Sequence, residues 1–249
     1  MAQNFRAPRL HVAAPLAAGE TAALSAEQMN YLVNVLRLGA GGRALAFNGR
    51  DGEFLAEIVA AGRRGLALAL SERTRAPEAA PDVDLMFAPL KHARLDYLAQ
   101  KAVEMGAGRL QPVVTRRTQV ARLNLERLEA NAIEAAEQCG AVWTPRISSL
   151  EPLERALAAW PPSRLLVFCD EEAPAAGPLE ALRETKADHG VGLLIGPEGG
   201  FDEAERAGVL RVPRIVRLRL GPRVLRADTA AVAALALVQA TLGDWSHAR

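Results

Sequence analysis

Cysteine and histidine are scarce in this chain of 249 residues, and their scarcity excludes two kinds of protein. The two cysteines, Cys139 and Cys169, lie far apart in apolar company, so the sequence predicts a reducing compartment and no disulfide framework. Four histidines, His11, His92, His189 and His247, are scattered along the sequence. Histidines and cysteines so placed do not have the spacing of a metal-ligand set, and we therefore predict no metal site.

Lysine and aromatic residues are also rare. Only Lys91, Lys101 and Lys186 are lysines among the 30 basic residues, so arginine carries nearly all the positive charge. Arginine binds phosphate through two N–H groups and stacks on bases, although the same bias is typical of a GC-rich genome or a thermophile. Aromatic residues make up 4% of the chain, which gives little support for a base-stacking platform. The net charge of +1 excludes a chain that is basic throughout.

Long apolar runs are missing. No run reaches the length of a membrane span, and the N-terminus begins with polar residues instead of the apolar core of a signal peptide. We therefore expect a cytoplasmic protein. Half of the residues are hydrophobic, which is enough for a sizeable core, and the length allows one large domain or two smaller ones.

Residues 1–75 predict a small β-rich domain with one helix. Ser25 and Gln28 have the spacing of a capping box, and apolar residues follow at helical intervals. Short apolar runs at 44–47 and 54–59 flank a glycine-bearing turn, which indicates a hairpin. Further strand candidates are 9–13 and 66–70. Together these elements predict a small β-barrel.

A linker rich in proline and small residues spans 74–82 and predicts a domain boundary near residue 76. Beyond it, strand patterns alternate with helix patterns. The predicted strands are 83–88, 110–115, 164–169, 191–195 and 215–220, and the predicted helices are 94–105, 125–139, 178–184, 202–207 and 228–242. This alternation indicates an α/β domain over residues 76–249, with a parallel sheet and helices on both faces. Asp202 with Glu205, and Asp228, are the predicted caps of the last two helices.

Two glycine-bearing loops near the C-terminus predict a ligand pocket. The segments 191–201 and 218–230 each break at Gly-Pro after a predicted strand and lead into a helix. This order places both loops at the carboxyl ends of strands, where ligands bind in α/β domains. Glycine also lets a backbone approach a flat ligand closely. No Lys-Ser/Thr follows the glycines and the spacing is not G-x-G-x-x-G, which leaves a backbone-lined pocket for a molecule such as an adenosine.

Four sequence blocks carry a resemblance to a known family. They are Val35–Leu38, Gln100–Gly106, Ala132–Gly140, and the pair Leu194–Phe201 with Leu218–Ala230. In this order, over nearly the whole chain, they resemble the RsmE family of SPOUT-class RNA methyltransferases. The chain departs from the family pattern at Asn30 and Tyr31, where the family carries a histidine pair, at Asn34, where it often has arginine, and at Asp228, where it has glutamate.

The resemblance implies a fold and an activity. Residues 1–75 would form a PUA-like RNA-binding β-barrel, and residues 76–249 a SPOUT domain with a C-terminal trefoil knot. The implied reaction is S-adenosylmethionine-dependent methylation of N3 of a uridine in the decoding region of 16S rRNA, on the 30S subunit. The implied assembly is a homodimer with the cofactor pocket close to its interface. The expected cofactor-binding residues are Leu194, Ile195, Gly196, Pro197, Gly199, Gly200, Leu218, Leu220, Gly221, Leu225, Thr229 and Ala230.

Methylation of uracil N3 requires loss of its proton, because the protonated nitrogen is a poor nucleophile. A cation beside the base would stabilise the developing anion, and Arg226 is our candidate. A carboxylate would accept the proton or orient the base, and Glu198 is preferred over Asp228. Structural alternatives remain for each residue: a salt bridge of Arg226 to one of the two carboxylates, a helix-terminal anion at Glu198, and a simple N-cap at Asp228.

Arginines are the predicted RNA contacts. The candidates are Arg6, Arg9, Arg37 and Arg50 in the first domain and Arg116, Arg117 and Arg122 after a strand end in the second. They would track phosphates, and an ordinary solvated surface is the alternative. The target base must be unpaired or flipped to reach the pocket.

Three other functions compete with the N3 methyltransferase hypothesis. A ribose 2′-O-methyltransferase of the same fold would commonly show a Ser/Asn-rich final motif, whereas this chain has Leu225–Thr229. A non-catalytic ribosome-assembly factor would not need two intact Gly-Pro loops. A small-molecule phosphate enzyme would use the lysine that these loops lack.

Overall fold

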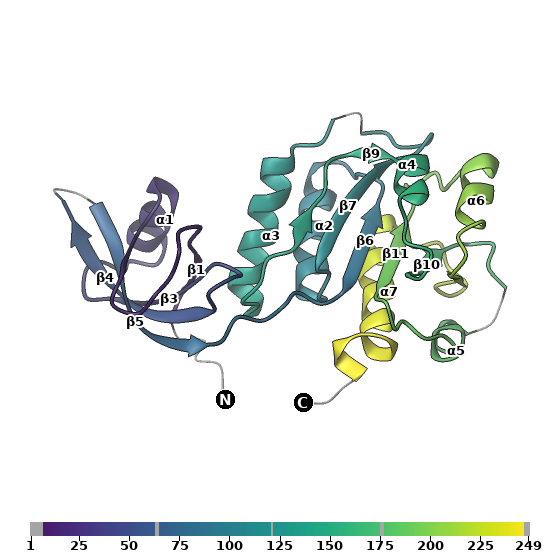
Figure 1. The fold of residues 1–249 in the computed structure, drawn as a ribbon. Helices are drawn as coiled ribbons and strands as arrows, with labels where there is room; N and C mark the ends of the chain where they lie inside the picture. Colours follow the sequence, from purple (N-terminus) through teal and green to yellow (C-terminus); the bar gives the residue numbers. More distant parts are fainter. Residues whose placement is uncertain (1–6, 63–64, 121, 175–176, 247–249) are drawn as a thin grey trace. The chain divides into compact units, whose positions relative to one another are not determined.

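The computed structural model describes residues 7–62, 65–120, 122–174 and 177–246 (Figure 1). Its internal contacts divide the chain into two units. Unit 1 comprises residues 1–79 together with 133–144, and unit 2 comprises 80–132 together with 145–249. The sequence contains no signal for the assignment of 133–144 to unit 1, and the boundary near residue 76 stays a prediction.

Unit 1 contains a five-stranded sheet. Its strand order is β1 (Arg9–His11), β3 (Arg43–Phe47), β4 (Glu53–Ala61), β5 (Gly65–Arg75) and β2 (Thr21–Ala23). Strand β1 pairs with β3 in parallel, and the other neighbours pair antiparallel. Within the described residues β1 and β2 do not pair with each other, so the hydrogen-bonded strand order of the predicted small β-barrel is open between its two end strands. The core beneath the sheet includes the fully buried side chains of Leu10, Ile58 and Leu68.

Two local predictions in unit 1 are confirmed. Helix α1 (Ala26–Asn30) begins with a capping box, in which the Ser25 hydroxyl accepts from the Gln28 N–H at 3.1 Å and the Gln28 side chain accepts from the Ser25 N–H at 2.9 Å. A π-helical turn, Tyr31–Val35, follows it. Strands β3 and β4 form the expected hairpin. In its turn, Gly52 has a φ of +93° and a Cβ there would lie 2.3 Å from the Arg75 carbonyl, so only glycine fits.

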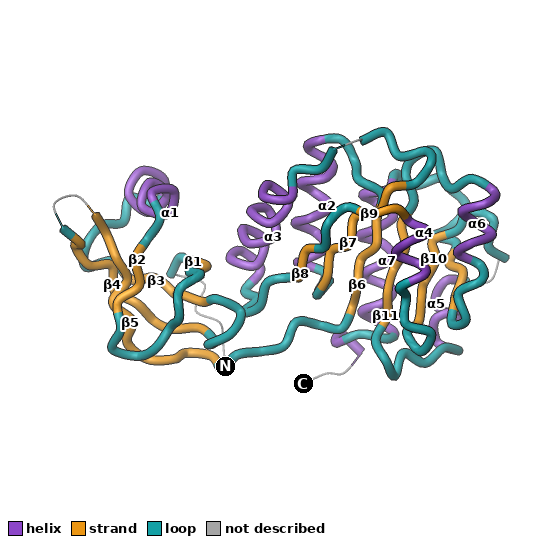
Figure 2. Tube along the Cα trace, turned by 45° about the horizontal axis from the view of Figure 1, so that its top comes forward, coloured by secondary structure: helices purple, strands orange, loops and turns teal. Residues whose placement is uncertain are grey.

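The strands of unit 2 form a second sheet (Figure 2). All of its strand pairs are parallel, as the alternating sequence pattern predicts. Its order is β12 (Ile215–Leu218), β10 (Leu165–Cys169), β11 (Val191–Ile195), β6 (Val83–Phe87), β7 (Arg109–Val114) and β8 (Arg146–Ile147), with β9 (Glu151–Pro152) also paired to β7. Strands β6 and β11 are buried along their whole length, as expected of central parallel strands covered on both faces. The sequence pattern does not predict β8 and β9, because each strand has only two residues and so short a segment shows no periodicity.

Helices of unit 2 pack in two groups. Helices α2 (His92–Glu104) and α5 (Pro178–Arg183) each contact α7 (Ala227–Thr241), and α4 (Leu153–Ala158) contacts α6 (Glu203–Val209). Helix α3 (Leu125–Cys139) has the predicted bounds, and its residues from 133 onward belong to unit 1. The α4–α6 group packs on Met86, Leu166 and Leu194 of the sheet. Because side chains alternate along a strand, the residues next to Met86, Leu166 and Leu194 in sequence point to the other face of the sheet. None of the helices in the described residues is long and apolar enough to cross a membrane.

The caps of the last two helices differ from each other. Asp202 and Glu205 form the predicted capping box at the start of α6, with the Glu205 N–H donating to Asp202 at 2.7 Å. The prediction that Asp228 caps α7 is wrong. The N-cap residue is Arg226, and Asp228 lies two residues after it in the first turn, where its carboxylate accepts the neighbouring Thr229 N–H at 2.9 Å.

Candidate functional site

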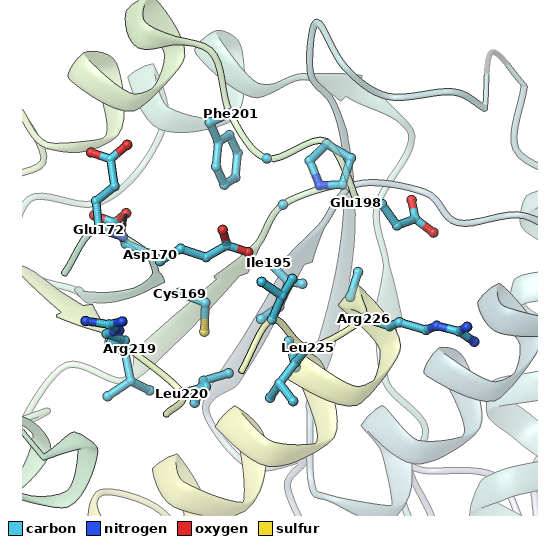
Figure 3. Close-up of a pocket in the computed structure, with 18 of the residues that line it drawn as sticks. Cys169, Asp170, Glu172, Ile195, Glu198, Phe201, Arg219, Leu220, Leu225 and Arg226 are labelled. Atoms are coloured by element: carbon cyan, nitrogen blue, oxygen red, sulfur yellow. Dashed lines mark hydrogen bonds between the residues drawn. The ribbon is translucent and has the colours of Figure 1, made fainter. Parts of the chain in front are cut away.

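A pocket of about 640 Å³ opens in unit 2 at the carboxyl ends of β10, β11 and β12 (Figure 3). Three loops line it: 169–172 after β10, 195–201 after β11 and 218–227 around the end of β12. Because β10 lies between the other two strands, all three loops meet at one edge of the sheet. The volume is in the range of small-molecule and cofactor sites, and the position is where ligands bind in parallel sheets.

Most of the residues predicted to bind a cofactor come together here. The lining includes Ile195, Gly196, Pro197, Gly199, Gly200, Leu218, Leu220, Gly221, Leu225 and Ala230. Two predicted residues lie elsewhere. Leu194 is fully buried in the core on the α4–α6 side of the sheet, and Thr229 is exposed on the first turn of α7 outside the lining. Leu194 therefore supports the pocket wall from behind.

The glycines of the pocket serve different purposes. Gly200 and Gly221 have φ angles of +68° and +94°, and a Cβ on either would meet nothing within 4 Å. These two glycines give the loops their turns and leave open space in front of the backbone. Gly196 differs from the predicted close approach to a ligand. A Cβ there would lie 2.6 Å from the Phe201 ring, so this glycine makes room for a ring that packs edge-on against Phe168.

A charged network braces one side of the pocket. Asp170, directly after β10, is buried, and its carboxylate accepts from Arg206 at 3.0 Å and from Arg217 at 2.7 Å. Burial raises the pKa of Asp170, but donation from the two guanidiniums and from the Glu172 N–H outweighs it and holds the pKa below its usual value. The carboxylate thus ties the loop after β10 to α6 and β12.

Sequence reasoning missed this network. The available signal was an acidic residue at the end of a fully apolar strand, Leu165–Cys169. A charge in that position in a parallel sheet lies at the ligand-binding edge. Its neighbour Cys169 also lines the pocket. Burial, with a smaller contribution from the Asp170 charge, raises the pKa of the Cys169 thiol to about 12, so the thiol is protonated and unreactive at neutral pH.

Glu198 and Arg226 lie together on the opposite side of the pocket from Asp170 and Glu172 (Figure 3). Glu198 is bonded to Arg94 of α2, with 2.7 Å between Nη1 and Oε1. Arg226, for which a salt bridge to Glu198 was the structural alternative, is exposed and makes no ion pair or side-chain hydrogen bond among the described residues. The guanidinium of Arg226 is therefore available to a ligand.

The loop after β7 is bonded to the glycine loop of the pocket. Arg117 donates from Nη1 to the Gly199 carbonyl at 2.6 Å. Arg116 lies 3.1 Å from the Asp202 carboxylate, and its backbone N–H donates to Glu205 at 2.7 Å. Arg122 is exposed nearby along the chain. Two of the three arginines predicted for RNA in unit 2 thus lie beside the pocket, and Arg117 lines it.

The arginines predicted for RNA in unit 1 have different surroundings. Arg37 is exposed with a φ of +56°, and Arg50 is exposed and donates to the Ala13 carbonyl at 3.0 Å. Arg6 lies outside the described residues. Arg9 is not placed to contact RNA, and this prediction needs correction. Only 8% of its side chain is exposed. Its donors bind Glu53 and the carbonyls of Ala136, Glu137 and Ala141.

Among the described residues, no group of three or more His, Cys, Asp or Glu side chains is placed to hold a metal ion.

Comparison with known proteins agrees with this architecture. A family model described as an RNA methyltransferase domain matches residues 77–239, and one described as an RNA methyltransferase PUA domain matches residues 24–70. Together with the fold and the pocket, these matches define the class: the chain is an RNA methyltransferase with a PUA-like N-terminal domain.

Relatives along the whole chain narrow the class to one family. A protein of Synechocystis named ribosomal RNA small subunit methyltransferase E is 30% identical, covering 94% of this chain and 78% of its own length. One of the same name from Rickettsia conorii is 28% identical, with 93% and 94% covered. The crystal structure of a protein of that name from Neisseria gonorrhoeae, bound to S-adenosyl methionine, has a TM-score of 0.81 at 27% identity. The match covers 96% of this chain and 100% of the Neisseria chain. The chain belongs to the ribosomal RNA small subunit methyltransferase E family.

Proposed function

We propose that this protein transfers a methyl group from S-adenosylmethionine to N3 of a specific uridine in the decoding region of 16S rRNA. The observation that carries the proposal is the pocket built from the two Gly-Pro loops, in a chain of this family. The Neisseria relative is bound to S-adenosyl methionine, and it shares the fold over nearly the whole chain.

The residues of the pocket fit this cofactor. Gly200 and Gly221 leave open space in front of two backbone turns, which suits a flat adenosine held by main-chain groups. Ile195, Leu220 and Leu225 supply apolar walls. When bound, S-adenosylmethionine supplies an electrophilic methyl group. The chain's contribution is to hold cofactor and base in line, and such positioning accounts for much of the rate in group transfer.

Arg226 and Glu198 are the proposed catalytic residues. Arg226 has no competing side-chain partner in the described structure and faces the pocket from the start of α7. It would stabilise the negative charge that develops on the uracil ring as N3 loses its proton. Glu198 would accept that proton or orient the base. Arg94 binds Oε1 of Glu198, which leaves Oε2 to face the substrate.

The finer description of the fold belongs to the same proposal. Residues 1–75 would be the PUA-like RNA-binding domain, and residues 76–249 a SPOUT methyltransferase domain with a C-terminal trefoil knot. The strand order supports this, because β10 lies between β11 and β12 although it precedes both in the sequence. A homodimer is the proposed assembly. Helix α7 supports it, since Val232, Ala236 and Leu237 remain only half-buried within the chain.

The proposed partner is the 30S subunit, which places the activity in the cytoplasm. RNA contacts would come from Arg116 and Arg117 beside the pocket, from the exposed Arg122, and from Arg37 and Arg50 in unit 1. Because the pocket lies at the end of a sheet, the target nucleotide must be unstacked before its base can enter.

Methyl transfer from labelled S-adenosylmethionine tests the proposal. Purified 30S subunits and free 16S rRNA from cells lacking the modification are offered separately, and incorporation is followed with time. We expect label in 30S subunits at a higher rate than in free rRNA. Binding of the cofactor without transfer to either RNA would contradict the proposed substrate, and no cofactor binding at all would contradict the assignment of the pocket.

A further inference from the structure

The loop 219–226 presents three arginines at the mouth of the pocket. Arg219, Arg223 and Arg226 are exposed and line the pocket. Within the described residues, none of the three guanidiniums makes an ion pair or a hydrogen bond. The loop itself contains no acidic residue. It therefore carries three uncompensated positive charges over eight residues.

The other guanidiniums of the pocket are already bound to protein groups. Arg206 is held by Asp170 and Glu172, and Arg117 donates to the Gly199 carbonyl. Arg217, just before the loop, is bound by Asp170 and donates to the Glu172 carbonyl. The guanidiniums of Arg206 and Arg217 thus brace the pocket through Asp170, whereas those of the loop 219–226 have no protein partner among the described residues and are available to a polyanion.

An apolar side chain lies among these charges. Val224 is 81% exposed, the highest value among the exposed large hydrophobic residues of the described chain. The turn before it contains Gly221, with a φ of +94°, and Pro222, whose ring restricts the backbone, so the loop presents Val224 to solvent. Apolar side chains beside basic ones are used to separate stacked bases in distorted nucleic acid.

We propose that Arg219, Arg223 and Val224 bind the RNA strand that flanks the target nucleotide. Arg219 and Arg223 bind phosphates on the strand next to the target, and Val224 packs against the neighbouring base and takes the place of the one that leaves the stack. This inference rests on the proposed function and adds the segment that holds the substrate open. Neither arginine nor Val224 belongs to the residues that we assign to cofactor binding or catalysis.

Direct binding separates this proposal from the proposed function. Binding of 30S subunits and of a fluorescent single-stranded RNA is measured as a function of salt for the wild type and for the double variant Arg219→Gln/Arg223→Gln. We expect RNA affinity to fall at least about tenfold at moderate salt, and the slope of log K against log salt to decrease by about 1.4, as expected for two lost contacts to single-stranded phosphates. Cofactor affinity by calorimetry should remain unchanged.

The matched control removes the same charge elsewhere in unit 2. Arg183 on α5 and Arg211 after α6 are exposed and have no side-chain hydrogen bond or ion pair among the described residues. Arg183→Gln/Arg211→Gln should retain the wild-type affinity and salt slope. If the loop variant binds RNA like this control while the wild type methylates 30S subunits, the loop proposal is wrong and the proposed function stands. If the wild type binds cofactor but no RNA, both are wrong.

Val224 is tested by rate instead of affinity. Val224→Ser should bind RNA within about twofold of the wild type but methylate it at least about tenfold more slowly, because a base-separating side chain affects how readily the target base leaves the stack. Val224→Leu, which keeps an apolar side chain, should methylate RNA at the wild-type rate. Thermal stability should not change in either variant, since the side chain is exposed. Normal turnover in Val224→Ser would overturn the role of this residue.

Discussion

Asp170 is the residue on which the integrity of the pocket depends most directly. In Asp170→Asn the shape is kept, but Arg206 and Arg217 lose a shared, buried carboxylate. Charge-assisted hydrogen bonds contribute about 1.5–3 kcal/mol each, and solvent reduces this because both arginine side chains are about a quarter exposed. We therefore expect a loss of about 2–3 kcal/mol in the free energy of unfolding.

Calorimetric unfolding measures this loss. For a chain of this size, about 2–3 kcal/mol corresponds to a decrease in Tm of about 5–10 °C. The matched control is Glu172→Gln, whose side chain is 74% exposed and whose ion pair with Arg206 should contribute less than about 1 kcal/mol. Cofactor affinity should weaken in Asp170→Asn only, because the loop after β10 loses its connection to α6 and β12.

The pH dependence of this difference has a definite sign. The pKa of Asp170 is lowered in the folded state, so its stabilisation is present above the unfolded pKa of about 3.9 and is lost as pH falls through the lower folded value. The difference in Tm between wild type and variant should therefore stay constant from about pH 8 to pH 5 and then decrease in acid. An Asp170→Asn variant that melts within about 2 °C of the wild type at pH 7 would refute the reasoning.

Three further predictions concern the pocket. Gly221→Ala should cost about 1–2 kcal/mol of loop strain and weaken S-adenosylmethionine binding measured by calorimetry. The control Gly19→Ala in unit 1, where φ is +86° and a Cβ also meets nothing within 4 Å, should leave binding unchanged. Equal cofactor affinity in both variants would contradict the account. Cys169, with a thiol pKa of about 12, should react with iodoacetamide at pH 8 about a thousandfold more slowly than free cysteine. The alkylation rate should rise with pH over the whole pH range in which the protein stays folded. Alkylation at the rate of free cysteine would show that the thiol is not buried. Arg226→Ala should lower kcat at least about a hundredfold with little change in cofactor affinity, and Arg226→Lys should recover part of it; a wild-type rate in single turnover would exclude the catalytic role.

The sequence predicted those parts of the fold that follow from periodicity and turn chemistry. Strand β11 and helix α3 have the predicted bounds, because a five-residue apolar run that ends at Gly-Pro favours a buried strand and a long amphipathic stretch favours a helix. The capping boxes at Ser25 and Asp202 were also predicted, since a short polar side chain three residues before its partner defines the geometry locally.

Long-range pairing could not be predicted in this way. Nothing near Asp170 in the sequence indicates that Arg206 and Arg217 will meet it, because the three residues come together only through the order of β10, β12 and α6 in space. The same limitation explains the wrong prediction for Arg9, which was chosen as an RNA contact only because its side chain is basic. Its guanidinium is instead buried by carbonyls from residues more than a hundred positions away in the sequence.

The methylated nucleoside itself tests the central claim most directly. After reaction of 30S subunits with labelled S-adenosylmethionine, the 16S rRNA is digested to nucleosides and the labelled product is identified by chromatography and mass. A parallel digest to oligonucleotides locates it. Our account predicts 3-methyluridine from a single site in the decoding region. A ribose-methylated nucleoside, or label spread over many sites, would contradict it.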